Sequence, residues 1–463
     1  ALWHTGPFME TGMAARNLPG PYRIEHFRAR TWTVATNKAP LGVYRGVARP
    51  GACFAIERTI DEVARAVGRD PMEVRIDNLV TPEMMPYVSV CDMRFDNGDY
   101  PESVRRVAEL VDYQAVRVRQ SVGENDGRLI GVGLASFTEQ SAHGAEEWVR
   151  RRTPIVAGYE TATARLGSDG NLTLMVAIHS HGQGMETTLA QIAHEELGIH
   201  PDDVSVRFGD TAVSPFGMGT FASRSIVMGG GAVANACIKV RDKMARIAGN
   251  LLQCEAAEVT FAGGEACGPS GSMTLAEIGH IAHLRHEHLP DGMDPVLEET
   301  ATYEPAESAG VFSYATHAAV VLVDPGTGAV ELTDFAVVED CGTVVNPMIV
   351  DGQIIGGVVQ GIGTAMFEEV PYDDGGQPLA TTFADYLLPG AADIPSIKIG
   401  HMVTPAKLTK YGMKGMGEGG AIAPPAAIAN ALRDAFASSG AEFNETPLTP
   451  ARIRAVLDRA GQE

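Results

Sequence analysis

The sequence predicts an α+β protein of two domains. Short runs rich in Val, Thr, Leu and Phe, bounded by Gly, Asp and Asn, are typical of strands. They are mixed with longer segments whose apolar residues recur every three or four positions, as in helices. The chain has 463 residues, of which 45% are hydrophobic, so it can bury more than one core. A polar, glycine-flanked break at 123–127 predicts a boundary between a domain at 1–125 and a domain at 126–463.

The first domain is expected to contain an extended segment followed by three helices. Tyr22–Arg49 has the composition of extended chain, with a β-like run at Thr31–Ala35. Helical periodicity follows, and the proline that begins the second helix suits a first helical turn. The three predicted helices are Ala52–Val67, Pro71–Leu79 and Pro101–Gln120.

The second domain is expected to mix strands and helices throughout. Its β-like runs are Leu129–Phe137, Thr161–Leu166, Leu172–His179 and a hairpin of Phe312–Val323 with Val330–Glu339. Its helical segments are Met185–Leu197, Ile226–Leu252, Asp351–Phe367, Pro424–Phe436 and Pro450–Arg459.

Charge and cysteine spacing exclude several classes of protein. A formal net charge of −22 argues against a nucleic-acid partner, which normally requires a basic face. The six cysteines include no C-x-x-C pair, so neither a zinc site nor an iron–sulfur cluster finds its ligands here. The longest uncharged apolar stretch, Gly352–Phe367, is shorter than the ~20 residues of a membrane span. Because Ala1–Gly20 contains Glu10 and Arg16, we expect no signal peptide and a cytoplasmic location.

Two polar loops ahead of predicted helices are candidates for ligand binding. Glycines let a ligand approach the backbone, and hydroxyls near helical N–H groups suit a phosphate or a polar ring edge. Ordinary turns and helix caps use the same residue types, so this pattern leaves both interpretations open. The residues are Gly182, Gln183 and Gly184 before one helix, and Thr220, Ser223, Arg224 and Ser225 before another.

Glu418 is the candidate catalytic residue. It lies in Gly415–Gly420 (GMGEGG), which formally matches the G-x-G-x-x-G of dinucleotide-binding proteins. That interpretation is weak, because Lys407–Tyr411 is too polar for a buried parallel strand and Pro424 stands where the helix should run. A carboxylate between glycines leaves room for a substrate, and poor solvation favours its taking a proton. The alternative is an exposed loop glutamate.

Arg45 is a candidate for orienting the substrate. It ends the extended stretch in Val43-Tyr44-Arg45-Gly46, where a guanidinium could bind a carbonyl or an anion. An exposed or salt-bridged arginine is the alternative.

Taken together, these segments resemble the large subunit of the molybdenum hydroxylases, the family of xanthine dehydrogenase and aldehyde oxidase. Five motifs occur in the family's order over about residues 20–440. They are Val43–Pro50 (VYRGVARP), Gly182–Thr188 (GQGMETT, resembling GQG-x-x-T), Thr220–Ser225 (TFASRS, resembling T-x-x-S-R-S), Asp340–Gln353 (DCGTVVNPMIVDGQ, resembling D-x-G-x-x-x-N-P…GQ) and Gly415–Gly420 (resembling G-x-G-E).

The resemblance implies elongated molybdopterin-binding domains of the xanthine dehydrogenase large-subunit type. It implies a molybdenum ion held by the dithiolene of molybdopterin, in bacteria usually the cytosine dinucleotide, with no metal ligand from the protein. Glu418 would be the base and Arg45 would position the substrate, an electron-poor carbon of an N-heterocycle or an aldehyde that is hydroxylated with water-derived oxygen. The cofactor would be bound by Gly182, Gln183, Gly184, Thr220, Ser223, Arg224, Ser225, Gln353 and Gly417.

Departures from the family pattern imply partners. The chain lacks the GGGFGGK-like loop of the earlier half of a large subunit, and Ala1–Gly20 resembles the middle of a domain. The resemblance therefore implies a partner chain that carries the N-terminal half, as in the divided subunit of some nicotinate dehydrogenases, or a processed fragment. The iron–sulfur clusters and FAD would lie on separate subunits. The carbon monoxide branch has a Cys in the loop after its YR motif, and here no Cys occurs before Cys53, which disfavours that substrate. A non-catalytic scaffold subunit with the same fold is the alternative.

Overall fold

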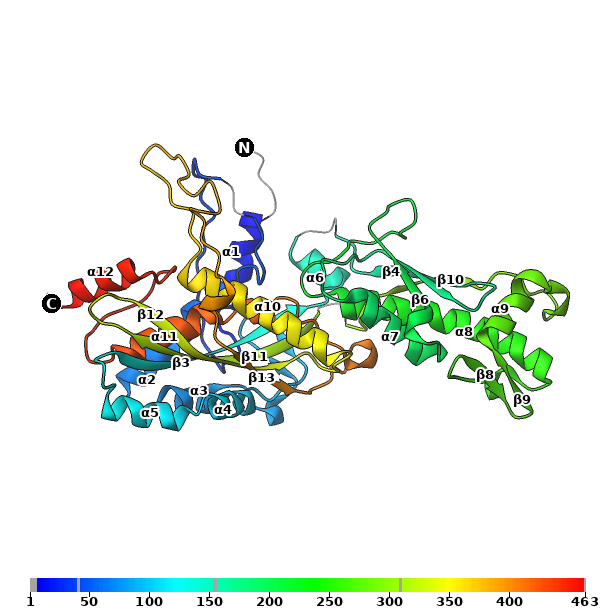
Figure 1. The fold of residues 1–463 in the computed structure, drawn as a ribbon, viewed down its shortest axis with the longest axis horizontal. Helices are drawn as coiled ribbons and strands as arrows, with labels where there is room; N and C mark the ends of the chain where they lie inside the picture. Colours follow the sequence, from blue (N-terminus) through cyan, green and yellow to red (C-terminus); the bar gives the residue numbers. More distant parts are fainter. Residues whose placement is uncertain (1–5, 40–41, 153–155, 308–309, 462–463) are drawn as a thin grey trace.

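A computed structural model describes residues 6–39, 42–152, 156–307 and 310–461. Two bodies lie side by side in an elongated molecule, and each is built on a four-stranded sheet with helices packed against it (Figure 1). The predicted α+β class is confirmed. None of the described helices is both long and apolar enough to cross a bilayer.

The larger sheet is the scaffold of the first body. Its strands, in spatial order, are β13 (Ile397–Met402), β12 (Val330–Asp340), β11 (Val311–Val323) and β3 (Leu129–Ser141). Strand β11 runs antiparallel to both β3 and β12, so the predicted hairpin is present, and β13 joins β12 in parallel. Helices cover both faces of this sheet, which explains why β3 and β11 are buried at nearly every position.

Alternate residues of these strands belong to two separate cores. One face packs against α10 (Pro347–Met366) and α11 (Pro424–Ala435), with α12 (Pro450–Ala460) at its edge. Gly131 and Gly133 allow α11 to lie directly on β3, because a Cβ at either position would come within about 2 Å of an α11 carbonyl oxygen.

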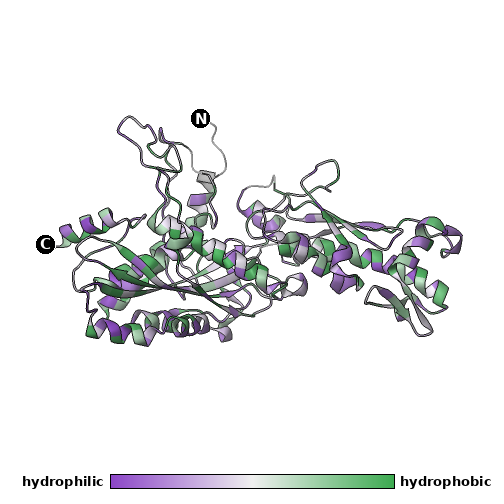
Figure 2. Cartoon of the chain, in the orientation of Figure 1, coloured by the Kyte–Doolittle hydropathy of each residue, from purple (hydrophilic) through white to green (hydrophobic). Residues whose placement is uncertain are grey.

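The opposite face is covered by helices from the first 125 residues. These are α2 (Arg49–Ala66), α3 (Pro71–Asn78), α4 (Tyr100–Leu110) and α5 (Tyr113–Val122), with the short strands β1 (Tyr87–Val88) and β2 (Arg94–Phe95) between them. The single helix predicted over 101–120 is wrong, because Asp112 has a left-handed backbone (φ 49°) and its side chain caps α5 at the Ala115 N–H. These surface helices carry hydrophilic and hydrophobic residues side by side (Figure 2).

The second body contains the smaller sheet and a peripheral β-sheet. The smaller sheet has the order β10 (Glu298–Tyr303), β4 (Glu160–Leu166), β5 (Leu172–Val176) and β6 (Val204–Arg207). Helices α7 (Met185–Leu197) and α8 (Gly230–Leu252) form its core with the sheet. The three-stranded sheet β7 (Thr260–Ala262), β8 (Glu265–Gly268) and β9 (Gly271–Thr274) and helix α9 (Leu275–Leu284) lie beyond them. A π-helical turn at Ser225–Gly229 precedes α8, where the sequence predicted regular helix from Ile226.

Two long irregular segments project from one side of the first body, near α1 (Gly6–Asn17), and α6 (Ala145–Arg150) belongs to the second body beyond α1 (Figure 1). They are residues 23–39 and 367–396. The predicted strand at Thr31–Ala35 lies in the first of them. It is extended, but it pairs with no strand of the described chain.

Candidate active site

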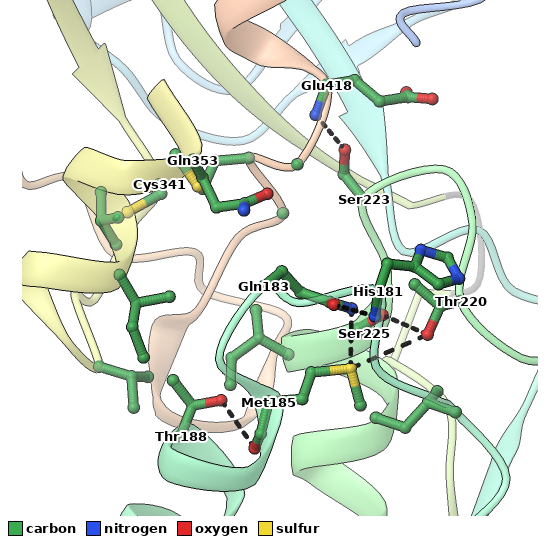
Figure 3. Close-up of a pocket in the computed structure, with 18 of the residues that line it drawn as sticks. His181, Gln183, Met185, Thr188, Thr220, Ser223, Ser225, Cys341, Gln353 and Glu418 are labelled. Carbon is green, nitrogen blue, oxygen red and sulfur yellow. Dashed lines mark hydrogen bonds between the residues drawn. The ribbon is translucent and has the colours of Figure 1, made fainter. Parts of the chain in front are cut away.

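A cavity of about 490 Å³ lies where the loops that precede α7 and α8 meet the start of α10 and the loop 414–418 (Figure 3). Four segments far apart in the sequence therefore line one space, as the motif analysis predicted. Most of the lining side chains are apolar or carry neutral amides and hydroxyls. The fully charged residues among them are Arg45, Lys414 and Glu418.

Glu418 lies at one end of this cavity, immediately before the short 3-10 turn at Gly419–Ala421. Its backbone N–H donates a hydrogen bond to Ser223 Oγ over 2.9 Å, which joins the loop 414–418 to the loop ahead of α8 (Figure 3). The residue is only 9% exposed. The alternative of an exposed loop glutamate is therefore wrong.

The loop that carries Glu418 is fixed by its first two residues. The Lys414 ammonium is fully buried, 2.7 Å from Asp340 Oδ2, and also donates to Asn97 Oδ1. Gly415 follows, and a Cβ there would lie 1.7 Å from the Ser223 carbonyl oxygen. Only glycine permits such a close approach, so Gly415 allows the loop 414–418 to pack against the loop that carries Ser223.

This geometry also excludes the dinucleotide-binding interpretation of Gly415–Gly420. An irregular segment precedes the loop, and the next regular helix, α11, begins only at Pro424. A dinucleotide fingerprint requires a strand before the glycines and a helix directly after them.

Arg45 holds the loop 414–418 against α10. Its Nε donates to the Gly417 carbonyl over 2.6 Å, and its Nη2 donates to the Gln353 carbonyl over 3.2 Å and to Gln353 Oε1 over 3.4 Å. Burial lowers the pKa of the Arg45 guanidinium, while the carboxylates of Glu139 and Glu418 act in the opposite direction. Arg45 lines the cavity as predicted, and its role towards a substrate stays a prediction.

Arg49 is the site residue that the sequence analysis missed. It is the first residue of α2, and its Nη1 lies 3.1 Å from Glu418 Oε2. Its guanidinium also donates to the carbonyls of Gly46 and Gln140, and its side chain is 2% exposed. The signal was present in VYRGVARP, whose second arginine follows a turn and precedes a proline.

The hydroxyl-rich loop ahead of α8 presents Thr220, Ser223 and Ser225 to the cavity. Ala222 and Ser223 both have left-handed backbones, which turn the chain sharply here. Thr220 Oγ1 donates to the His179 carbonyl over 2.7 Å, and Ser225 Oγ donates to Thr220 Oγ1 over 3.1 Å. These hydroxyls therefore form a connected polar wall.

Arg224 differs from its prediction, because it does not line the cavity. Its side chain is fully buried and forms an ion pair with Glu160 at the start of β4. Glu160 Oε1 also accepts the backbone N–H groups of Met218 and Gly219. In this structure Arg224 thus stabilises the loop from behind, and the backbone geometry it maintains positions the neighbouring hydroxyls.

The glycine loop ahead of α7 brings two of its three predicted residues to the cavity. Gly182 and Gln183 line it, and a Cβ on Gly182 would meet nothing within 4 Å, so space remains in front of the backbone. Gln183 Nε2 donates to the His179 carbonyl over 3.4 Å. Gly184 instead caps α7 with a left-handed backbone and packs against Ile349, so it lies outside the cavity lining.

Two further acidic residues lie behind Glu418. Glu139 of β3 and Glu339 of β12 point from the same face of the larger sheet towards Gly419, where a Cβ would lie 3.4 Å from Glu139 Oε2 and 2.7 Å from Glu339 Oε1. Burial, with the charge of Glu418, raises the pKa of Glu139 to about 8. Burial also raises the pKa of Glu339, and the charge of Glu139 adds to it. Burial therefore favours the protonated form of both groups, which limits the negative charge behind Glu418.

Comparison with known proteins identifies the family. A model of the molybdopterin cofactor-binding domain matches residues 106–395, more than half of the chain, and a second model of the same description matches residues 3–79. The chain belongs to the molybdopterin cofactor-binding family.

Relatives and solved structures of this family agree with the fold. The large subunit of nicotine 6-hydroxylase from Paenarthrobacter nicotinovorans is 34% identical over 443 residues, covering 92% of this chain and 53% of that protein. The structure of quinoline 2-oxidoreductase from Pseudomonas putida 86 superimposes with a TM-score of 0.92 at 37% identity, over 98% of this chain and 58% of that one. The Cu,Mo-CO dehydrogenase structure gives a TM-score of 0.85 at 30% identity, over 92% of this chain and 54% of that one. The chain spans about half the length of the relatives it matches, and the predicted membership of the molybdenum hydroxylases is confirmed.

The cavity fits a molybdopterin cofactor. In a chain of net charge −22, Glu418 is the only acidic residue among the cavity-lining residues, and it is paired with Arg49. The wall offers amides, hydroxyls and backbone N–H groups, which are the donors that phosphates and pterin ring edges require. The described residues contain no cluster of three His, Cys, Asp or Glu side chains with the geometry of a metal site.

Proposed function

We propose that this chain is the C-terminal part of the molybdopterin-binding subunit of a molybdenum hydroxylase. The enzyme would hydroxylate an electron-poor carbon of a small molecule with water-derived oxygen. The single observation that carries the proposal is the position of Glu418: this buried glutamate is one of the residues that line a cavity together with the motifs of the family.

The cofactor, which in this proposal is the cytosine dinucleotide form, would supply the two-electron redox chemistry. Gly182, Gln183, Thr220, Ser223, Ser225, Gln353 and Gly417 would bind its pterin and phosphates, since all of them line the cavity. Arg224 and Gly184 would act indirectly, by fixing the backbone of the two loops. These side chains would bind and orient the cofactor, and the cofactor would supply the redox chemistry.

Glu418 would act as the general base at its carboxylate oxygens. Arg49 holds Oε2 from one side, which leaves Oε1 for the proton that is transferred. The Ser223 hydroxyl accepts a hydrogen bond from the Glu418 backbone N–H and so fixes the position of this residue at the cavity. Arg45 would orient the substrate while it holds Gly417 and Gln353 in place.

An aromatic N-heterocycle is the substrate class that we favour. Cys53 is buried in α2, with its Sγ 3.9 Å from the Ser136 carbonyl, and it does not line the cavity, which supports the exclusion of carbon monoxide. The apolar side chains of the cavity wall suit a flat ring. The relatives named after nicotine and quinoline support the same class, and an aldehyde is the second candidate.

The complete enzyme would require partners. Residues 1–125 would be the C-terminal part of a first molybdopterin-binding domain and residues 126–463 the second. The chain that carries the N-terminal half would complete the site, and iron–sulfur and flavin subunits would take the two electrons. All six cysteines are free thiols in the described structure, which supports a reducing compartment such as the cytoplasm.

Metal and pterin analysis of the co-purified complex tests the proposal. We expect one molybdenum and one pterin for each copy of this chain, with the absorption spectrum of iron–sulfur clusters. Thr220→Val and Ser225→Ala should lower the pterin content, whereas Ser121→Ala, an exposed hydroxyl on α5, should leave it unchanged. A catalytically competent complex without molybdenum or pterin would refute the proposed function.

A further inference from the structure

Residues 25–39 form an extended segment whose sequence suits a β-strand. Thr31, Trp32 and Val34 have high β propensity, and every residue from 28 to 39 is exposed. The exposed fractions of the Trp32 and Val34 side chains are 69% and 72%. A folded domain rarely leaves an aromatic and a branched aliphatic side chain so open without a partner.

The two sides of this segment have different surroundings. Phe27 and Ala29 line a cavity of about 860 Å³ together with residues of α1 and α6. Side chains alternate along extended chain, so Trp32 and Val34 belong to the other side. The Arg30 guanidinium lies 5.9 Å from the Trp32 ring centre, as expected of two residues that share one side of a strand. The segment therefore has one face towards this chain and one face towards a partner.

The backbone of residues 25–32 offers an open strand edge. Within the described chain, no backbone-to-backbone hydrogen bond joins residues 25–32 to another segment. Extended chain with free N–H and C=O groups is a template for pairing with a strand of another polypeptide.

A second exposed segment stands beside the first and extends the same surface. Residues 367–396 rise next to residues 23–39 (Figure 1), and the Lys38 ammonium lies 5.1 Å from the centre of the Tyr372 ring. Phe383 at 81% exposure is the most exposed of its apolar side chains, which include Leu387 and Leu388. Loops of this length without regular structure normally have a function such as binding.

The greater length of the relatives indicates which polypeptide would cover this surface. The relatives are nearly twice as long as this chain, and the segment lies within residues 3–79, which match a molybdopterin cofactor-binding domain. Among its described residues, the range 3–79 contributes helices and no strand, so a strand that pairs with residues 27–34 would come from the part of a large subunit that this chain does not span.

We propose that residues 27–34 form a β-strand in a sheet supplied by the N-terminal half of the large subunit, with Trp32 and Val34 buried against that half. The inference rests on the partner chain of the proposed function. It adds that the two halves are joined by strand pairing, and it assigns the residues that make the pairing.

Hydrogen–deuterium exchange on the assembled complex tests the pairing directly. We expect the backbone amides of residues 27–34 to exchange at least a hundredfold more slowly than those of the exposed turn at 124–127, because paired strand amides are protected. Exchange of residues 27–34 as fast as that turn would overturn the inference.

Variants separate strand pairing from general stability. Trp32→Ser should lower recovery of the two-part complex at least tenfold. Arg30→Pro and Thr31→Pro each remove one N–H, and these two N–H groups lie on opposite edges of a strand. At least one of the two proline variants should therefore lower recovery to the same extent. Val122→Ser is the matched control, since Val122 is 80% exposed on α5. The melting temperature of each isolated variant chain should stay unchanged, which excludes misfolding as the cause.

The outcomes distinguish the two proposals. If the wild-type chain assembles and the Trp32 and both proline variants assemble equally well, the strand inference is wrong and the proposed function stands. If the wild-type chain co-purifies with no such half, the proposed partner fails, and the strand inference fails with it. A homodimer that forms through residues 27–34 would also overturn the inference.

Discussion

The Arg49 guanidinium lies 3.1 Å from the Glu418 carboxylate, and the exposed fractions of the two side chains are only 2% and 12%. The arginine begins a helix of the first 125 residues, whereas the glutamate lies 369 positions later. The proposed base therefore depends on the packing of α2 against the C-terminal loops. Three carbonyl or carboxylate acceptors fix the guanidinium, so it has little freedom to leave Glu418.

Arg49→Gln should lower kcat/KM roughly ten- to a hundredfold, since a hydrogen bond to a charged group contributes about 1.5–3 kcal/mol. Arg49→Lys should lose less kcat/KM than Arg49→Gln, because lysine keeps the positive charge. Arg128→Gln is the control, because the Arg128–Glu331 pair is exposed and contributes little. An unchanged kcat/KM in Arg49→Gln would show that Arg49 does not act on the base.

Glu139→Gln should make the stability of the protein less dependent on pH. The pKa of Glu139 is raised to about 8 by burial and by Glu418, while Arg49 and Arg45 oppose the shift and Glu339 faces it from β12. Between the unfolded value near 4.5 and about 8, the folded state holds a proton that the unfolded state has released. Stability therefore falls as pH rises through this window.

The melting temperatures at pH 5.5 and pH 8.5 measure this effect. Glu139→Gln should gain stability relative to wild type at the higher pH and little at the lower one. Glu339 has the same sign of shift, so the slope should become shallower without disappearing. An equal change in melting temperature at both pH values would contradict the assignment of a protonated Glu139.

Gly415→Ala should disrupt the site, because the new Cβ would lie 1.7 Å from the Ser223 carbonyl oxygen. The loops that carry Glu418 and Ser223 would have to separate, and bound pterin should fall with the melting temperature. Gly352→Ala provides the control, since a Cβ there, on the exposed face of α10, meets nothing within 4 Å. That variant should be slightly stabilised, by up to about 1 kcal/mol, from helix propensity. Equal behaviour of the two variants would argue against close contact between the loops.

Arg224→Met should destabilise the protein by about 3–5 kcal/mol, because it leaves the buried Glu160 carboxylate without its partner. Arg165→Met on the same strand as Glu160 is the control, since its pair with Glu298 is exposed and 3.7 Å long. Thermal unfolding of both variants would measure the difference. A direct contact of Arg224 with cofactor phosphate predicts instead a loss of pterin without a large loss of stability.

The sequence was sufficient for the fold class and for most of the cavity wall. Glu418, Gln183, Thr220 and Ser223 each lie in a short local motif with glycines or hydroxyls, and such motifs can be recognised without knowledge of the tertiary structure. The helix Met185–Leu197 was predicted with its observed bounds, because a glycine flanks it on each side.

What could not be predicted depends on partners distant in the sequence. Arg49 pairs with Glu418, which lines the cavity, whereas Arg224 pairs with Glu160, which does not, and these partners lie 369 and 64 positions away in the sequence. The break at Asp112 depends on a left-handed backbone that an aspartate tolerates but does not require. The strand expected at Thr31–Ala35 needs a neighbouring strand that the described chain does not contain.

Glu418→Gln in the assembled complex tests the central claim most directly, with turnover and molybdenum content measured on the same preparation. Glutamine keeps the size of the side chain and a hydrogen-bonding oxygen for Arg49, but it cannot take a proton. We predict that molybdenum and pterin stay at wild-type content while turnover falls by roughly 10²–10⁴-fold, the contribution expected of a general base. Wild-type turnover with full molybdenum content would contradict the account.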